Sequence, residues 1–471
     1  MKCKTIIGLE THIELGTKQK MFCGCAAEYF GKPPNSHVCP VCLGLPGALP
    51  VPNKQAIEWT ILIGLSLNCK INLESYFERK HYFYPDLPKG FQISQYQKPF
   101  CYNGWIIVND KKIKITRVHL EEDTGKLLHG EQLSDPGSSY IDFNRSGVPL
   151  VEIVTEPDID SPNLAVAYLK QLQLLIQYLG VSDCDMEKGS MRCEPNISLK
   201  VKSQKSPLRS RQSRSFRLRR GYGGQVEGQA KVKNDRLPDY KVEIKNINSF
   251  KFVKNALKYE QKRQQLALEQ EEKLTQETRR YLESSSKTEA MRTKEFAQDY
   301  RYFPEPDIPP ISFKTSDIKK FQLTLSKKEL PKQRIKRFQE EYKLDKQTSL
   351  VLVENKKLGD YYLELVKQIK KDQKPDYQNL ANLLINRKIS IKLNPTQFIE
   401  KAVNLTTKKP VDPKKINPLI KQVIINNPQA VQDYKKGKQT ALQFLLGQVL
   451  RETGKQVEVK EMVKLLEIQL K

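Results

Sequence analysis

Polar and apolar residues alternate in several short segments of the first 300 residues, as they do in half-buried β-strands. One such segment near the N-terminus places Glu10, His12 and Glu14 on the same strand face. Apolar residues recur with helical spacing in residues 164–179 and 255–270. These patterns predict an α+β fold in which helices pack against a largely antiparallel sheet.

The character of the sequence changes after a proline-rich stretch at residues 303–310. All Cys, His and Trp residues precede this stretch, and Lys- and Leu-rich amphipathic helical patterns follow it. A second break, at the prolines between residues 408 and 418, indicates a last helical module. We therefore predict a first α+β domain over residues 1–300, an all-α helical domain over 301–404 and a small helical tail over 405–471.

A basic segment interrupts the first domain. Residues 203–220 include seven Lys or Arg residues and no acidic residue, and a glycine-rich stretch follows at 221–224. This composition predicts a mobile loop. The loop could be an arm that contacts RNA, or a solvated insertion without a partner.

Charge and hydropathy narrow the class of protein. Lys and Arg total 80 and Asp and Glu 54, and the resulting net charge of +26 favours a polyanionic partner, nucleic acid first, although it also serves solubility. The apolar content of 38% and the mean hydropathy of −0.59 exclude wholesale disorder and a multispan membrane protein. The longest apolar stretch, 59–67, is too short to span a bilayer. Because Glu10 and His12 lie where a signal peptide would be apolar, we expect a cytoplasmic protein without membrane contact.

Nine cysteines, an odd number without a secretory signal, argue for reduced thiols. Four of them form two short-spaced pairs: Cys23, Cys25, Cys39 and Cys42. Four thiolates match the tetrahedral preference of zinc and leave no open position for water, so the spacing predicts a structural Zn²⁺ site. Redox-active or simply buried thiols are the alternative, and His37 could replace one sulfur.

Further acidic residues lie where strands are expected. Residues 117–126 hold three consecutive acids, among them Glu121 and Glu122, and Glu152 lies inside the apolar run 148–154. Buried carboxylates favour a cation, and several of them could hold Mg²⁺ beside ATP phosphates. The alternative is a surface ion-pair network. The sequence contains no GxxxxGK[ST] or GxGxxG motif, so a nucleotide site would be unconventional, and no GxSxG hydrolase motif.

Several longer strings together carry a family resemblance. They are IGLETHIEL at 7–15, CPVCLGLPGALPV at 39–51, HYFYPD at 81–86, HLEEDTG at 119–125, DFNRSGVPLVEIV at 142–154, DYRYFPEPD at 299–307 and GKQTALQFLLGQV at 437–449. On these residues the chain closely resembles the B subunit of the aspartyl/glutamyl-tRNA(Asn/Gln) amidotransferase. The resemblance runs in order from residue 4 to the end.

The resemblance implies a catalytic cradle domain, a helical domain and a tRNA-binding tail. In that family this subunit uses ATP and Mg²⁺ to phosphorylate the side-chain carboxylate of Glu or Asp misattached to tRNA(Gln) or tRNA(Asn). Ammonia from glutamine, hydrolysed on the glutaminase (amidase) partner, then forms the amide, and a small third subunit straps the pair together. The implied roles are Mg²⁺ or channel-mouth ligands at His12, Glu122 and Glu152 with Glu10 and Glu121 nearby, and phosphate or channel contacts at Lys80 and Lys89.

The chain also departs from the family pattern. Residues 203–240 replace a short turn, and Asp239-Tyr240 stand where Gly-Thr is usual. Glu194-Pro195 replace a common Asp-Ala, and a proline without an amide donor could shift strand pairing. A zinc-stabilised tRNA-binding protein or a scaffold, without catalysis, is therefore the alternative function. The natural substrate could be Glu-tRNA(Gln), Asp-tRNA(Asn) or both.

Overall fold

The computed structural model describes residues 3–129, 138–201, 237–291, 300–369, 376–406, 413–452 and 459–470. The chain divides into two compact units, Met1–Leu330 and Pro331–Lys471. The predicted basic loop at 203–220 lies outside the described residues, as does most of the predicted insertion over 203–240.

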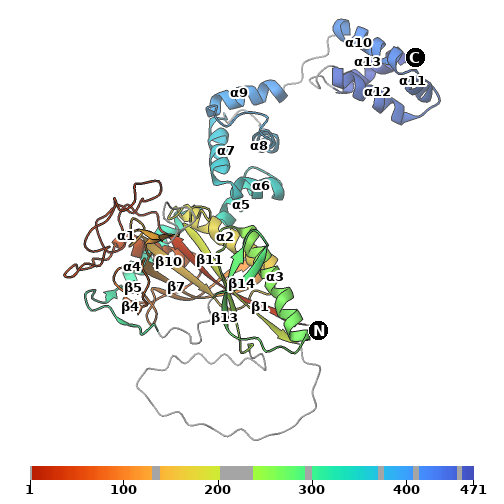
Figure 1. The fold of residues 1–471 in the computed structure, drawn as a ribbon. Helices are drawn as coiled ribbons and strands as arrows, with labels where there is room; N and C mark the ends of the chain where they lie inside the picture. The colour runs from red at the N-terminus through yellow and green to blue at the C-terminus, as the bar shows by residue number, and fades with distance from the viewer. Residues whose placement is uncertain are drawn as a thin grey trace. The chain divides into compact units, whose positions relative to one another are not determined.

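A nine-stranded sheet forms the centre of the first unit (Figure 1). Its order is β14 (Lys287–Ala290), β13 (Glu277–Leu282), β12 (Val242–Lys245), β11 (Met191–Val201), β1 (Cys3–Glu14), β10 (Pro149–Thr155), β7 (Lys111–Glu122), β6 (Cys101–Val108) and β2 (Lys70–Ile71). Neighbouring strands are antiparallel except β12 and β13, which are parallel. The structure thus confirms the predicted α+β class with a largely antiparallel sheet.

Strand β1 lies in the middle of this sheet and carries the alternation seen in the sequence. Leu9, Thr11 and Ile13 are buried, whereas Glu10 and His12 point to the opposite face and are partly exposed. β1 pairs with β10 on one side and with β11 on the other. The sheet therefore has one apolar face and one polar face.

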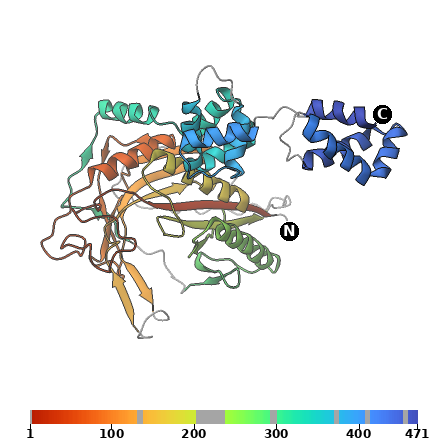
Figure 2. The same cartoon turned by 90° about the horizontal axis from the view of Figure 1, so that it is seen from above.

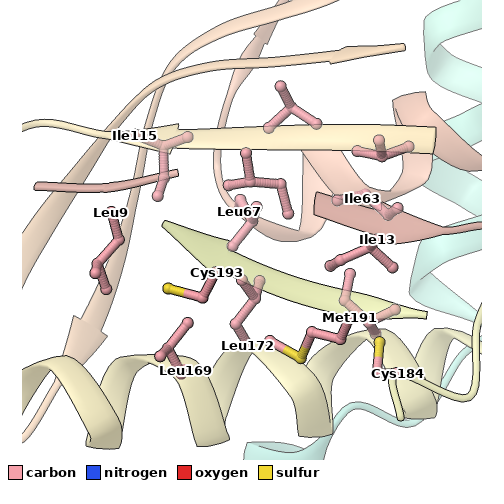
Figure 3. Packing of buried hydrophobic residues seen from close by; sticks show 14 of the residues in the cluster. Leu9, Ile13, Ile63, Leu67, Ile115, Leu169, Leu172, Cys184, Met191 and Cys193 are labelled. Atoms are coloured by element: carbon pink, nitrogen blue, oxygen red, sulfur yellow. The ribbon is translucent and has the colours of Figure 1, made fainter. Parts of the chain in front are cut away.

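Three helices complete the core on the apolar face: α1 (Lys54–Ser66), α2 (Pro162–Leu179) and α3 (Phe250–Glu269). Each begins where a side-chain oxygen caps free backbone amides, at Asn53, Ser161 and Ser249. α2 ends at Gly180, whose φ of 71° suits a residue without a side chain. Figure 3 shows Leu172 of α2 among the buried side chains that pack between the helix and the sheet.

The residues that depart from the family pattern fit this sheet. Pro195 pairs in register with Leu9, and β11 continues on both sides of it, so the proline does not interrupt the strand. β11 pairs with β12 only at Asn196 and Ile197. Further along β11, the backbone N of Leu199 donates a hydrogen bond of 3.0 Å to the Tyr240 hydroxyl. This hydroxyl takes the place of a carbonyl group from a neighbouring strand.

Small sheets extend the first unit past residue 300. β15 (Phe303–Pro304) pairs with β4 (Glu78–His81), which also pairs with β5 (Phe91–Ser94), and β16 (Ile311–Ser312) pairs with β3 (Glu74–Ser75). β8 (Lys126–His129) and β9 (Ser139–Asp142) form a two-stranded antiparallel sheet, and α4 (Thr315–Ser326) packs on α1. A division at residue 300, as the proline-rich stretch suggested, would separate β15 from β4.

The described part of the second unit is helical. It contains α5 (Pro331–Glu340), α6 (Lys346–Glu354), α7 (Lys356–Gln368), α8 (Tyr377–Ile385), α9 (Pro395–Thr406), α10 (Pro413–Asn426), α11 (Pro428–Lys435), α12 (Gln439–Glu452) and α13 (Val459–Leu470). Figure 2 shows α10 to α13 as a bundle, whose core includes Ile420, Leu445 and Leu466. None of the helices in the described ranges has both the length and the apolar character of a membrane span.

We expect Leu172→Ala to lower the free energy of unfolding of the first unit by about 2–5 kcal/mol, because the fully buried side chain leaves a cavity. The matched control is Leu266→Ala on α3, where the leucine is 58% exposed, and its effect should stay within about 0.5 kcal/mol. Urea unfolding followed by circular dichroism measures both. Equal effects would contradict the assigned core.

Candidate active site

Three side chains form a row across the polar face of the sheet. In the strand register, Glu152 of β10 pairs with His12 of β1 on one side and with His119 of β7 on the other. Glu152 Oε2 lies 3.4 Å from His12 Nε2 and 3.2 Å from His119 Nε2. Directly paired residues point to the same face of a sheet, so the backbone register alone brings these groups together.

Glu121 completes the group, because it lies two residues after His119 and therefore on the same face of β7. Its carboxylate is 3.7 Å from His12 Nε2 and 3.6 Å from His119 Nε2, and Ser94 Oγ donates a hydrogen bond to it at 2.9 Å. One ligand atom each from His12, Glu121 and Glu152 lies within 4.8 Å of the others. We call these three residues the His-Glu-Glu triad.

Burial and charge act against each other in the triad. Burial disfavours the charged imidazole, yet the carboxylates of Glu152 and then Glu121 raise the pKa of His12 to about 9. Burial likewise acts to raise the pKa of Glu152, but the charges of His119 and His12 hold it well below its ordinary value. Glu121 and Glu152, 2% and 6% exposed, are thus buried anions. Such groups require a cation, and protonated histidines or a metal ion can supply it.

A second carboxylate group lies beside the triad on the same face. Ligand atoms of Glu10 on β1, Glu194 on β11 and Glu243 on β12 also lie within 4.8 Å of one another. Lys245 Nζ is 3.2 Å from Glu194 and 3.7 Å from Glu243. Burial, followed by the charges of Glu152 and Glu194, raises the pKa of Glu10. A cation here would relieve the repulsion among these acids.

The predicted ligand set of His12, Glu122 and Glu152 is not what the structure brings together. Successive residues of a strand point to opposite faces, so Glu122 leaves the polar face that Glu121 occupies. Lys89 Nζ donates a hydrogen bond to Glu122 Oε1, and the backbone N of Ile93 donates a second at 3.0 Å. Glu122 and Lys89 therefore form an ion pair of their own.

The two predicted lysines also lie in different places. Lys89 pairs with Glu122, whereas Lys80 lies near the triad. Its ammonium is 5.0 Å from the ring centre of Tyr300 and 5.8 Å from that of Tyr82. Burial alone would lower the pKa of Lys80, but the charge of Glu121 is the largest of several that raise it well above its ordinary value. The side chain thus holds a fixed positive charge beside the buried carboxylates.

Sequence reasoning missed His119, Glu194 and Glu243 as site residues. His119 and Glu121 share a face of β7 by their spacing of two, and Glu194 bears the same relation to Asn196 on β11. The alternation could therefore have shown which residues of one strand share a face. It could not show which strands lie beside one another in the sheet.

The four predicted zinc ligands do converge. Sulfur atoms of Cys23, Cys25, Cys39 and Cys42 lie within 4.8 Å of one another. The backbone N of Cys39 donates to Cys42 Sγ at 3.1 Å, as amides do to metal-bound thiolates. All nine cysteines are free thiols. Four converging sulfur donors, which leave no position open for water, fit structural Zn²⁺. His37 is not part of this sulfur group.

A cluster of charged side chains lies around two buried acids, Glu14 at the end of β1 and Asp123. Tyr29 OH donates to the Glu14 carboxylate at 3.0 Å, and Arg192 forms an ion pair with Asp123. Burial, with the charge of Asp123 second, raises the pKa of Glu14 to about 8. Burial would also raise the pKa of Asp123, but Arg192 and Arg145 lower it to about 2. Glu14 is therefore mainly protonated at neutral pH.

Comparison with known proteins places these groups in a family. The model described as "GatB/GatE catalytic domain" matches residues 5–213 and 226–319, and the "GatB domain" model matches 364–470. The chain belongs to the GatB/GatE family. Every residue of the triad and all four cysteines lie within the catalytic-domain match.

Curated relatives agree with this family assignment. Proteins named as the B subunit of the aspartyl/glutamyl-tRNA(Asn/Gln) amidotransferase are similar over nearly the whole chain. That of Roseiflexus sp. is 39% identical over 98% of this chain and 97% of its own length. Those of Thermosipho melanesiensis and Carboxydothermus hydrogenoformans are 40% and 41% identical, over 98% and 96% of this chain and 98% and 95% of their own lengths. These matches confirm the predicted resemblance and the predicted enzyme class, a tRNA-dependent amidotransferase subunit of the ligase type.

The pKa of Glu14 predicts a pH dependence of stability. Because the folded-state pKa of about 8 exceeds the ordinary 4.5, the stability that Glu14 contributes is complete below pH 4.5 and lost as the pH rises through 8. Glutamine cannot ionise, so Glu14→Gln should raise Tm relative to wild type progressively between pH 5 and 8.

Thermal melting from pH 5 to 9 measures this difference. The exposed neighbour Glu28 provides the control variant Glu28→Gln, which should follow the wild-type curve. Parallel curves for wild type and Glu14→Gln would show that Glu14 does not hold its proton in the folded protein.

Proposed function

We propose that this GatB-family chain uses ATP to phosphorylate the side-chain carboxylate of Glu or Asp misattached to tRNA, and that ammonia then displaces phosphate to give the amide. The substrates would be Glu-tRNA(Gln), Asp-tRNA(Asn) or both. The observation that carries the proposal is the convergence of His12, Glu121 and Glu152 on the polar face of the domain matched as catalytic. The carboxylate must be activated, because a free carboxylate does not form an amide with ammonia, and phosphorylation turns its oxygen into a leaving group.

The polar face fits magnesium. His12, Glu121 and Glu152 would hold one Mg²⁺ through a nitrogen and two oxygens, and Glu10, Glu194 and Glu243 would hold a second through oxygens alone. Mg²⁺ held there would neutralise phosphate charge and help to orient the phosphates for transfer. The protein supports the ligands from outside, since Ser94 donates to Glu121 and Asn196 Nδ2 donates to Glu10 at 2.9 Å.

Lys80 and Lys245 would act on the phosphates as fixed charges. Each ammonium lies beside one of the two carboxylate groups, and neither can be neutralised at physiological pH, since nearby carboxylates raise both pKa values. A preorganised cation stabilises the negative charge that spreads over the transferred phosphoryl oxygens. No covalent nucleophile from the protein is needed for this reaction.

Lys89 and Glu122 would serve the route of ammonia instead. They form a polar pair on the face of β7 opposite to the triad. A polar lining suits a small polar molecule on its way from glutamine, hydrolysed on a partner amidase. We propose this amidase, a small third subunit that straps the pair together, and cytoplasmic assembly as the setting.

The remaining predicted parts support this chemistry. We propose that the cysteine group binds structural Zn²⁺ and that the helical second unit and its tail bind the tRNA backbone through Lys side chains. A tRNA-binding protein or scaffold without catalysis would not need a buried His-Glu-Glu triad. The intact triad therefore favours the enzyme.

The two neighbouring glutamates distinguish metal binding from ammonia supply. Glu121→Gln should lower ATP-dependent amide formation by on the order of 10²-fold or more with either nitrogen donor, since it removes a charged metal ligand. Glu122→Gln should impair the glutamine-dependent reaction more than the ammonium-dependent one. The assay uses the complex with its amidase partner, misacylated tRNA, ATP and Mg²⁺, with glutamine or ammonium.

Glu28→Gln is the matched surface control. If Glu121→Gln keeps wild-type rates with ammonium, Glu121 does not hold the catalytic metal. If the wild-type complex forms no amide in either assay while tRNA still binds, the alternative of a binding protein is correct.

Zinc should be stoichiometric in the purified chain. We expect Cys42→Ser to lose the metal and to lower Tm, because one neutral hydroxyl replaces a thiolate in a closed site. Cys3→Ser, outside the sulfur group, should keep both. Mass spectrometry of the metal content and thermal melting test this, and a metal-free wild type with free thiols would contradict it.

A further inference from the structure

A segment from the end of the first unit lies against the strand that carries Lys80. We call residues 300–307 the tyrosine strap. The backbone O of Tyr300 accepts a hydrogen bond from His81 N at 2.9 Å, β15 pairs with β4, and Glu305 N donates to Phe77 O at 2.8 Å. The strap therefore follows β4 along its length.

Two side chains of the strap, Tyr300 and Tyr302, pack edge to face with ring centres 6.2 Å apart, and Tyr300 contacts Lys80. The ring of Tyr300 lies 5.0 Å from Lys80 Nζ. The ring of Tyr302 stacks on Tyr96 with centres 4.7 Å apart and planes at 16°. Aromatic rings that contact an ammonium exclude water from it without neutralising it.

The strap is fixed on the other side of β4 by an ion pair between the partly exposed Arg79 and a buried carboxylate. Arg79 Nε and Nη2 each donate to a Glu305 oxygen at 2.7 Å, and Nη2 also reaches Asp307 at 3.2 Å. The Glu305 side chain is 0% exposed. The guanidinium also lies 4.3 Å from the ring centre of Phe91. Successive strand residues face opposite ways, so Arg79 does not share the face of Lys80.

We propose that Arg79 is a positioning residue for Lys80: its bidentate bond to Glu305 holds the tyrosine strap, and the strap holds and shields the ammonium. Without Arg79, the Glu305 carboxylate would be a buried charge with no partner, and it would move toward water and take the strap with it. The shielding is independent of the proposed function. Only the expected effect on catalysis rests on it.

The direct test is the reactivity of the Lys80 amine. The full-length chain is acetylated under limiting reagent, and labelling at each lysine is followed by peptide mass spectrometry. We expect Arg79→Met to raise the Lys80 labelling rate by about tenfold, since the partly buried amine becomes more exposed to water. Lys20, which is 1% exposed, reports on general unfolding and should stay unreactive.

Three further variants give the test its specificity. In Arg79→Met combined with Glu305→Gln no buried charge is left unpaired but the bidentate bond is still missing, so Lys80 labelling should fall only part of the way back to the wild-type rate. Arg280→Met removes an ion pair with Glu289 in which both side chains are about half exposed, and it should leave Lys80 unchanged. Unchanged labelling in Arg79→Met overturns the proposal.

If Lys20 becomes reactive in Arg79→Met, that variant has unfolded, and Arg79→Lys is used to test the proposal in its place. Lysine keeps the charge but loses the bidentate geometry, so Arg79→Lys should raise Lys80 labelling by a smaller factor.

Kinetics form a second arm. In the complex with its amidase partner, Arg79→Met should lower kcat for ammonium-dependent amide formation by on the order of 100-fold, with a smaller change in the KM for ATP. A change in KM alone would overturn a role in positioning Lys80. A wild-type complex without ATP-dependent amide formation would refute the proposed function, whereas the labelling result would still decide the role of Arg79.

Discussion

The contact of Glu152 with two imidazoles is the constraint on which the site depends. A carboxylate that is 6% exposed lies between His12 and His119, within 3.4 Å of both. Three adjacent strands supply these groups at directly paired positions. The long antiparallel register of β1, β10 and β7 therefore fixes the geometry of the site, and a one-residue slip would turn the charged side chains into the apolar core.

The rest of the first unit stabilises this arrangement from both sides. The helices α1, α2 and α3 bury the apolar face, so the sheet can carry unfavourable charges on the other. Two segments that are remote from each other in the sequence add to the polar face. They are β4, which carries Lys80, and the residues from 300 onward. Charge pairs such as Arg79 with Glu305 join these segments where the strands are short.

Much of this was readable from the sequence, and what was not has a physical cause. The alternation around His12 predicted a polar strand face, and the paired cysteine spacings predicted a sulfur group, because both signals are local. Glu122 was predicted as the ligand and Glu121 only as its neighbour, because the local pattern does not tell which of the two shares the sheet face of His12 and Glu152. Glu194 and Glu243 reach Glu10 only through the order of strands in the sheet, which local patterns do not encode. The proline-rich stretch at 303–310 indicated a domain boundary, yet it contains a strand that pairs with β4.

The central claim is that the buried carboxylates of the polar face hold a divalent cation. Anomalous diffraction at the manganese edge, from crystals of the full-length chain soaked in Mn²⁺, locates such an ion directly. The account predicts a peak bonded to His12, Glu121 and Glu152 that disappears in crystals of Glu152→Gln. Saturating Mn²⁺ with no peak at these residues, while the side chains stay ordered in an ion-pair network, would contradict it.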